Sequence, residues 1–238
     1  MIKNKKKKLK GKGKLIVIDG TDGSGKATQV DFLINRLRND GYEVRMVDFP
    51  EYYKNFFGAF VGHCLSEQYY NFINIHPKIA SVLYAADRFE SKGKIEEWLK
   101  KGYVVIANRY ASANQIHQGG KISNIKKRQD FIRWLDDMEH RVFGIPRPHI
   151  VFYLSLPIPF VTKLLKERNK NSNRAYLGKK KDVHEKDKNF MINSYKSAMW
   201  LADNQSNWCK INCVDKNKLR SREDIHEEVY KNVLKILK

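Results

Sequence analysis

A glycine-rich segment near the start of the chain, Gly20-Thr21-Asp22-Gly23-Ser24-Gly25-Lys26, has the GxxxxGK spacing of a phosphate-binding loop. Glycines let successive backbone N–H groups converge on phosphate oxygens, and the positive end of a following helix adds to the attraction. A lysine at the last position reaches the terminal phosphates as a point charge. We therefore expect a nucleoside triphosphate to be bound by Gly20, Asp22, Gly23, Ser24, Gly25, Lys26, Ala27 and Thr28.

The position after the lysine departs from the full pattern. A Ser or Thr there ordinarily holds magnesium through its hydroxyl group. This chain has Ala27 instead, with Thr28 next. The usual hydroxyl ligand is therefore missing.

Short apolar strands alternate with helical segments, and this alternation must position the loop. A buried strand at 14–19 before the loop and a helix at 25–40 after it are the context that a phosphate loop requires. Segments rich in β-branched and aromatic residues predict further strands. We expect strands at 14–19, 43–47, 103–107, 149–154 and 208–213, and helices at 25–40, 77–101, 124–141, 158–168, about 185–205 and 222–237.

Strands that alternate with helices predict a parallel sheet with helices on both faces and a ligand site at the carboxyl ends of the strands. The expected fold class is α/β, a three-layer P-loop NTPase fold with a central five-stranded parallel sheet and a short lid segment. The lid is assigned to about 169–188, because that stretch is polar and basic.

The length of 238 residues fits one domain with a sizeable core. Much of the net charge of +20 comes from the lysine-rich N-terminus and the basic segment around the lid. We expect residues 1–13 to be a disordered basic tail and residues 14–238 to form the domain. A nucleic-acid contact or targeting arm is the alternative for the tail, although no nucleic-acid signature accompanies it.

Three cysteines, Cys64, Cys209 and Cys213, lack the CxxC spacing of zinc or redox sites. We interpret them as structural thiols in a reducing, cytoplasmic compartment. The longest apolar runs fall far short of a membrane span, so no membrane association is expected.

Several further segments resemble the thymidylate kinase family. In the loop, Asp22 and Thr28-Gln29 are additions to a bare phosphate-binding pattern that this family shares. The resemblance continues in order along the chain from about residue 14 to residue 238. It is carried by Phe49-Pro50-Glu51-Tyr52, Leu83-Tyr84-Ala85-Ala86-Asp87-Arg88, Asn108-Arg109-Tyr110-Ala111-Ser112-Ala113-Asn114 and Asp182-Val183-His184-Glu185-Lys186-Asp187.

The resemblance implies that Lys26, Arg109 and Asp22 are catalytic, with Arg109 holding the acceptor phosphate. It also implies that the acceptor base stacks on Tyr84 and meets Arg88, whose contact favours thymine over cytosine. Without it, Tyr84 would be read as a core residue. The full implied dTMP site is Asp22, Phe49, Tyr52, Tyr84, Arg88, Arg109, Asn114, His117 and Gln118.

The resemblance further implies a magnesium ion held by Asp22 and Glu185, since the family's usual aspartate is replaced by Asn108. Arg168 or Arg174 in the lid would contact the ATP phosphates.

The implied activity is phosphorylation of dTMP to dTDP by ATP, in dTTP synthesis, and the implied assembly is a homodimer. Two alternatives stay open. One is a kinase of another pyrimidine nucleotide or deoxynucleoside, and the other is a degenerate nucleotide-binding protein whose basic tail holds a partner.

Overall fold

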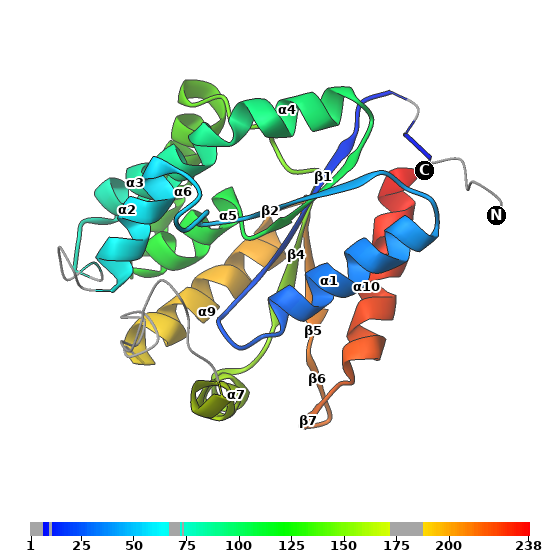
Figure 1. Cartoon of the computed structure of the whole chain (residues 1–238). Helices are drawn as coiled ribbons and strands as arrows, with labels where there is room; N and C mark the ends of the chain where they lie inside the picture. Colours follow the sequence, from blue (N-terminus) through cyan, green and yellow to red (C-terminus); the bar gives the residue numbers. More distant parts are fainter. Residues whose placement is uncertain (1–6, 10, 67–71, 73, 172–187) are drawn as a thin grey trace.

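The computed structural model describes residues 7–9, 11–66, 72, 74–171 and 188–238. Its centre is a sheet of five parallel strands, as expected, and the strands lie in the order β2-β3-β1-β4-β5 (Figure 1). The strands are β1 (Lys14–Gly20), β2 (Val44–Asp48), β3 (Val104–Asn108), β4 (Ile150–Ser155) and β5 (Trp208–Asn212).

The strand β1 lies in the middle of the sheet because both of its faces are apolar. Residues Leu15 to Ile18 are fully buried, as a strand covered on two sides requires. Ile18 pairs with Asn108 of β3, and Gly20 pairs with Leu154 of β4. This register brings the ends of β1, β3 and β4 to one edge of the sheet.

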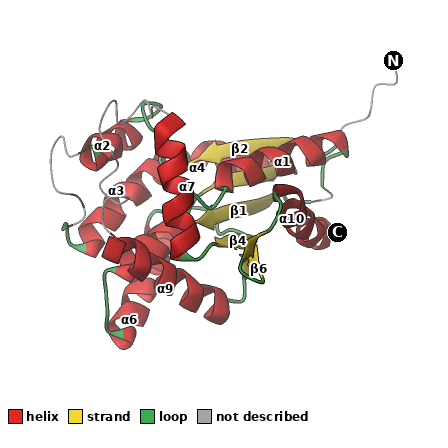
Figure 2. Ribbon diagram, turned by 90° about the horizontal axis from the view of Figure 1, so that it is seen from below, coloured by secondary structure: helices red, strands yellow, loops and turns green. Residues whose placement is uncertain are grey.

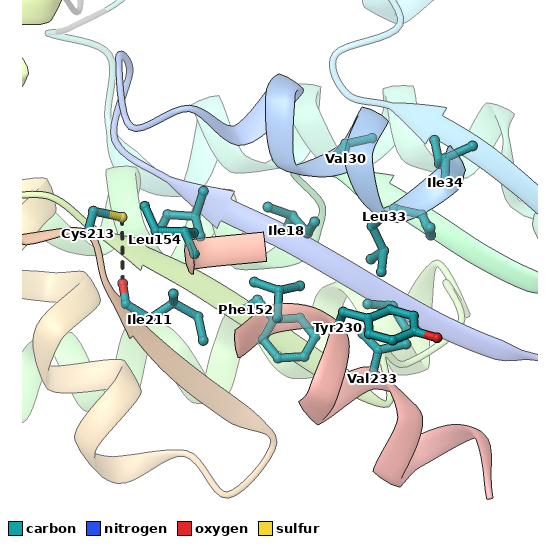
Figure 3. Close-up of a cluster of buried hydrophobic side chains, with 14 of the residues drawn as sticks. Ile18, Val30, Leu33, Ile34, Phe152, Leu154, Ile211, Cys213, Tyr230 and Val233 are labelled. Carbon is teal, nitrogen blue, oxygen red and sulfur yellow. Dashed lines mark hydrogen bonds between the residues drawn. The ribbon is translucent and has the colours of Figure 1, made fainter. Parts of the chain in front are cut away.

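One face of the sheet is covered by α1 (Lys26–Asn39) and α10 (Arg222–Leu237), which share a large apolar cluster with β1, β4 and β5 (Figure 3). The cluster includes Ile18, Leu33 and Val233, all fully buried. The side chains that alternate with these along the strands point to the opposite face, where Val17 and Val105 pack against Ile95. The two-residue period of the strands therefore separates two cores and gives three layers (Figure 2).

The helix expected at 77–101 is two helices, α3 (Pro77–Glu90) and α4 (Lys92–Lys100), which meet at Ser91. The hydroxyl of Ser91 donates a hydrogen bond to Glu51. The expected single helix at 124–141 is α6 (Ile125–Asp136) followed by the π-helical turn η2 (Asp137–Val142).

Several short elements were not expected from the sequence. They are α2 (Phe56–Leu65), α5 (Ala111–Ala113), the π-helical turn η1 (Asn114–Gln118) and the antiparallel pair β6 (Val214–Asp215) and β7 (Lys218–Leu219).

Helices α7 (Ile158–Asn171) and α9 (Lys188–Asn204) flank the region that the sequence assigns to the lid. Arg174 and Glu185 lie outside the described residues, and only the helical backbone of Arg168 is described.

The described part of the 1–13 segment is packed on the domain, in contrast to the disorder expected there. Lys7 forms a parallel bridge with Tyr42. The N–H of Leu9 donates to the carbonyl of Gly102 at 3.0 Å, and that of Gly13 to Leu99 at 2.7 Å. Backbone pairing of this kind does not depend on side-chain charge, so it could not be predicted from the lysine-rich composition.

Of the helices in the described ranges, none combines the length and the apolar character needed to cross a bilayer.

Candidate active site

A cavity of about 770 Å³ opens at the carboxyl ends of the strands, between the glycine-rich loop, α3, η1 and the start of α10. Of the site residues expected from the sequence, those that line it are Asp22, Gly23, Ser24, Gly25, Lys26, Ala27, Thr28, Phe49, Tyr52, Tyr84, Arg88, Arg109, Asn114, His117 and Gln118. Gly20 is the last residue of β1 and does not itself line the cavity. The fold therefore gathers segments that are separated by up to 96 residues in the chain.

The loop keeps its shape because glycine occupies its tightest positions. A Cβ atom at Gly20 would lie 2.6 Å from Ser24 Oγ and 3.0 Å from the Leu154 carbonyl. Gly25 is the N-cap of α1 in a left-handed conformation, with φ of 86°, and it provides no side-chain cap. The first N–H groups of α1 are thus left to an anion, as a phosphate site requires.

Lys26 is folded back into its own loop. Its Nζ donates to the carbonyls of Gly20 at 3.0 Å and Thr21 at 2.9 Å, and lies 3.5 Å from Asp22 Oδ1. Burial, aided by the charge of Arg109, lowers the pKa of Lys26 to about 8, against the opposing effect of Asp22 and Asp19. A triphosphate bound in the loop would offer this ammonium group negatively charged oxygen acceptors in place of the neutral carbonyls.

Arg109 follows β3 directly and has a positive φ of 63°. Its guanidinium forms ion pairs with Asp22 and, at 3.6 Å, with Asp19. Burial lowers the pKa of Arg109, but the carboxylates of Asp22 and Asp19 outweigh that effect and raise it. The arginine therefore stays a cation, held between the loop and the acceptor half of the cavity.

Asp19 was missed by sequence analysis although its position carried a signal. It is the last side chain of β1 before the loop, it is fully buried, and it accepts from Ser112 Oγ at 2.6 Å. An acid at the carboxyl end of a central strand is a candidate for holding a neighbouring cation. The same reasoning would have singled out Asp48 at the end of β2.

His117 connects Arg109 to α9. Its Nε2 lies 3.1 Å from Arg109 Nη1, and its Nδ1 lies 3.2 Å from Ser194 Oγ. The ring stacks on Phe190, with 5.8 Å between centroids and 13° between planes. Because a guanidinium can only donate, Nε2 is the acceptor in the hydrogen bond with Arg109.

The acceptor half of the cavity holds Arg88, Asn114, Tyr84 and Gln118. Tyr84 packs against Phe72 with 5.6 Å between ring centroids. The buried Gln118 Oε1 has no hydrogen-bond partner among the described residues. Arg88 and Asn114 both contact Glu139, a buried residue that no local pattern identified.

Oxygen donors suited to magnesium line the cavity beside the loop. Asp22, Asp48 and Asn108 all reach it, and the buried Asn108 Oδ1 has no partner among the described residues. Burial raises the pKa of Asp48, while the charge of Arg109 opposes that rise. No cluster of three or more His, Cys, Asp or Glu side chains poised for a metal exists within the described ranges. These donors fit a magnesium ion that takes its remaining ligands from phosphates and water.

The far side of the cavity was not expected from the sequence. It is lined by Cys213, Leu219, Arg220, Arg222 and Ile225, from the β6–β7 hairpin and the start of α10. Arg220 is anchored by Glu228 at 2.6 Å. Burial raises the pKa of Cys213 to about 12, so this thiol stays protonated, in line with a structural role.

Comparison with known proteins decides the family. A family model described as thymidylate kinase matches residues 18–229. The chain belongs to the thymidylate kinase family. As a member, it is an ATP-dependent nucleoside monophosphate kinase.

Relatives of this thymidylate kinase family member come from distant organisms. The thymidylate kinase of Plasmodium falciparum is 28% identical over 229 residues, covering 95% of this chain and 92% of the relative. The human thymidylate kinase is 28% identical over 152 residues, covering 64% of this chain and 65% of the relative. The solved structure of thymidylate kinase from Candida albicans has a TM-score of 0.71 at 18% identity and covers 94% and 92% of the two chains. That structure confirms the fold.

The lowered pKa of Lys26 predicts proton uptake when ATP binds. Free enzyme above pH 8 has lost the Lys26 proton, since its pKa is about 8, whereas bound phosphates favour the ammonium form. We therefore expect ATP binding at pH 9 to take up about one proton, and little at pH 7.5. Calorimetry in two buffers of different ionisation enthalpy measures this number. A Lys26→Arg variant should show no uptake at either pH, and equal uptake in both proteins would contradict the assignment.

Proposed function

We propose that this enzyme transfers the γ-phosphoryl group of ATP to dTMP, giving dTDP and ADP. The observation that carries this proposal is the cavity itself, which has the phosphate loop and Lys26 at one end, Arg88 and Asn114 at the other, and Arg109 between them. Family membership and the names of the relatives support the same reaction. The degenerate, non-catalytic alternative is not favoured.

Phosphoryl transfer demands positioning and charge neutralisation more than covalent chemistry. The loop N–H groups and Lys26 hold the donor phosphates. Arg109 draws the acceptor phosphate toward them, because its planar fork matches two phosphate oxygens at once. Asp22 and His117 fix the orientation of that guanidinium before either substrate arrives.

A nucleotide panel with coupled detection of ADP tests the proposal. We expect the highest kcat/KM with dTMP, a lower value with dUMP, and weak activity with dCMP or thymidine. The Candida albicans relative is described as having broad substrate specificity, which makes the panel more informative than a single substrate. Turnover of another acceptor without turnover of dTMP would overturn the proposal.

We also propose magnesium as the metal of the reaction, held by Asp22 and Glu185 at the acceptor phosphate, with Asn108 in reach of the same region. The ion supplies positive charge on the transferred phosphate when bound. Replacing Glu185 by alanine is expected to raise the magnesium concentration for half-maximal activity by about tenfold, the usual cost of losing a metal-site partner. Glu97→Ala on α4 is the control and should keep the wild-type magnesium dependence. An unchanged magnesium dependence in Glu185→Ala would contradict the assignment of Glu185 as a ligand.

A homodimer through α2 and α3 is a further proposal. Ile79, Val82 and Phe89 follow a three- and seven-residue spacing along α3, and all are exposed. Phe56, 71% exposed, begins α2 beside the end of α3, where the N–H of Phe57 donates to Glu90 at 2.9 Å. An apolar stripe of this kind on a charged protein is a self-association surface.

The dimer proposal predicts that the double variant Val82→Glu/Phe89→Glu is a monomer, because each protomer would bring two carboxylates into the apolar interface. Light scattering coupled to gel filtration measures the mass. Met46→Glu, at an exposed apolar position on β2, should leave the wild-type mass unchanged. A wild-type protein that is monomeric at micromolar concentration would contradict the proposal.

A further inference from the structure

A buried carboxylate on η2 holds both polar residues at the base end of the cavity. Glu139 is 1% exposed, and both of its oxygens face Arg88. The Nε of Arg88 lies 2.8 Å from Oε2, and Nη2 lies 2.5 Å from Oε1. The same Oε1 accepts from the amide of Asn114 at 2.7 Å.

These contacts determine which way the Asn114 amide faces. Its Nδ2 donates to Glu139 and, at 3.1 Å, to the carbonyl of Ser81. Both partners can only accept, so both amide hydrogens are committed and the orientation of the amide has no alternative. The group that Asn114 can offer to a molecule in the cavity is therefore the acceptor Oδ1.

Arg88 is constrained in the complementary sense. Glu139 accepts one N–H from Nε and one from Nη2, and the N–H groups that remain on Nη1 and Nη2 can only donate, so Arg88 offers a donor to a molecule in the cavity that it lines. One donor beside one acceptor matches the imide edge of thymine or uracil, which presents O4 and N3–H. Cytosine presents an amino group and an unprotonated N3 there, so both of its contacts would be donor to donor or acceptor to acceptor.

We propose that Glu139 is a specificity-determining positioning residue, which sets Arg88 and Asn114 as a fixed donor–acceptor pair that accepts imide bases and rejects cytosine. The inference rests on the proposed pyrimidine nucleotide site. Asn114 and Glu139 both belong to π-helical turns: Asn114 begins η1, and Glu139 is inside η2. Such turns are frequent at functional sites.

Binding of dTMP and 5-methyl-dCMP tests the proposal, because these nucleotides differ only in the edge that Arg88 and Asn114 face. Wild-type protein should bind dTMP at least about 100-fold more tightly, since mismatched polar groups in a buried site are strongly rejected. In Glu139→Gln, an NH2 group that cannot accept replaces one of the two carboxylate oxygens, so Arg88 and Asn114 together lose an acceptor and are no longer held as a fixed pair. The preference should then fall by about tenfold or more.

Three comparisons separate this role from a merely structural one. The ratio of dTMP to dUMP affinity should not change in Glu139→Gln, since both bases share the imide edge. Asp87→Asn, a fully buried carboxylate beside Arg88 that does not line the cavity, should change thermal stability and leave the preference intact. If Glu139→Gln does not fold, Arg88→Gln/Glu139→Gln removes both charges together, and it should discriminate less than Arg88→Gln alone.

The proposal is overturned if Glu139→Gln keeps the full preference for dTMP, or if the wild type binds both nucleotides equally. Calorimetric binding does not require turnover, so this outcome is read separately from the kinase assay. A wild type that prefers dTMP but does not phosphorylate it would refute the proposed function and leave the role of Glu139 standing.

Discussion

Arg109→Ala is expected to lower kcat for dTMP phosphorylation by about 10³-fold, the usual scale for removing a cation that stabilises a transferring phosphoryl group. The guanidinium lies between the loop and the acceptor half of the cavity, paired with Asp22 and Asp19. Both arginine and alanine carry a Cβ atom at the positive φ of this position, so the backbone strain is the same in either protein. The loss should therefore be catalytic.

Steady-state kinetics on Arg109→Ala and Arg109→Lys measure this effect. Lysine keeps the charge without the planar fork, so it should restore only part of the rate. Arg45→Ala, on β2 with its side chain against Tyr103, removes an arginine elsewhere and should have wild-type activity. If Arg109→Ala kept more than about a tenth of the wild-type kcat, an essential role in phosphoryl transfer would be excluded.

Lys26→Ala is expected to lower kcat/KM for ATP by about 10³-fold or more, because it removes the point charge nearest the terminal phosphates. The lysine is 8% exposed and is held by the carbonyls of Gly20 and Thr21. Those carbonyls would face each other without a donor in the variant. The loop should therefore also bind ATP more weakly.

Kinetics with varied ATP, together with ATP titration by calorimetry, measure both parts of that prediction. Lys14→Ala, on β1 at the opposite end of the strand from the loop, is the matched control and should keep wild-type values. An unchanged affinity for ATP in Lys26→Ala would contradict a phosphate-binding role for this loop. An unchanged kcat with weaker binding would limit Lys26 to ground-state recognition.

Much of the site was predictable because its parts are local. The glycine pattern, the strand before it and the helix after it are each properties of a few adjacent residues. The parallel sheet followed from the alternation of strands and helices, and its strands begin and end within one residue of the predicted bounds. Once the strands are parallel, their carboxyl ends must share an edge, so Lys26, Asn108 and Arg109 had to meet.

The breaks in helices were not predictable, because distant residues cause them. Ser91 separates α3 from α4, and its hydroxyl bonds to Glu51, which lies 40 positions earlier in the chain. The continuous helical pattern over 77–101 contains no sign of that partner. The π-helical turn that carries Glu139 likewise interrupts a segment with ordinary helical composition.

The sequence by itself determined the phosphate loop and the order of strands and helices along the chain, since each depends on short-range pattern and on the rules of parallel sheets. The acceptor residues of the cavity were found through the family resemblance. Only the tertiary structure decided how the side chains in that cavity are held. Arg88 and Glu139 are 51 residues apart, and Asn114 and Glu139 are 25 apart. A hydrogen bond between such residues depends on the path of the whole chain. The sequence shows that Arg88 can donate and that Asn114 can accept, but only the fold shows which way each side chain faces.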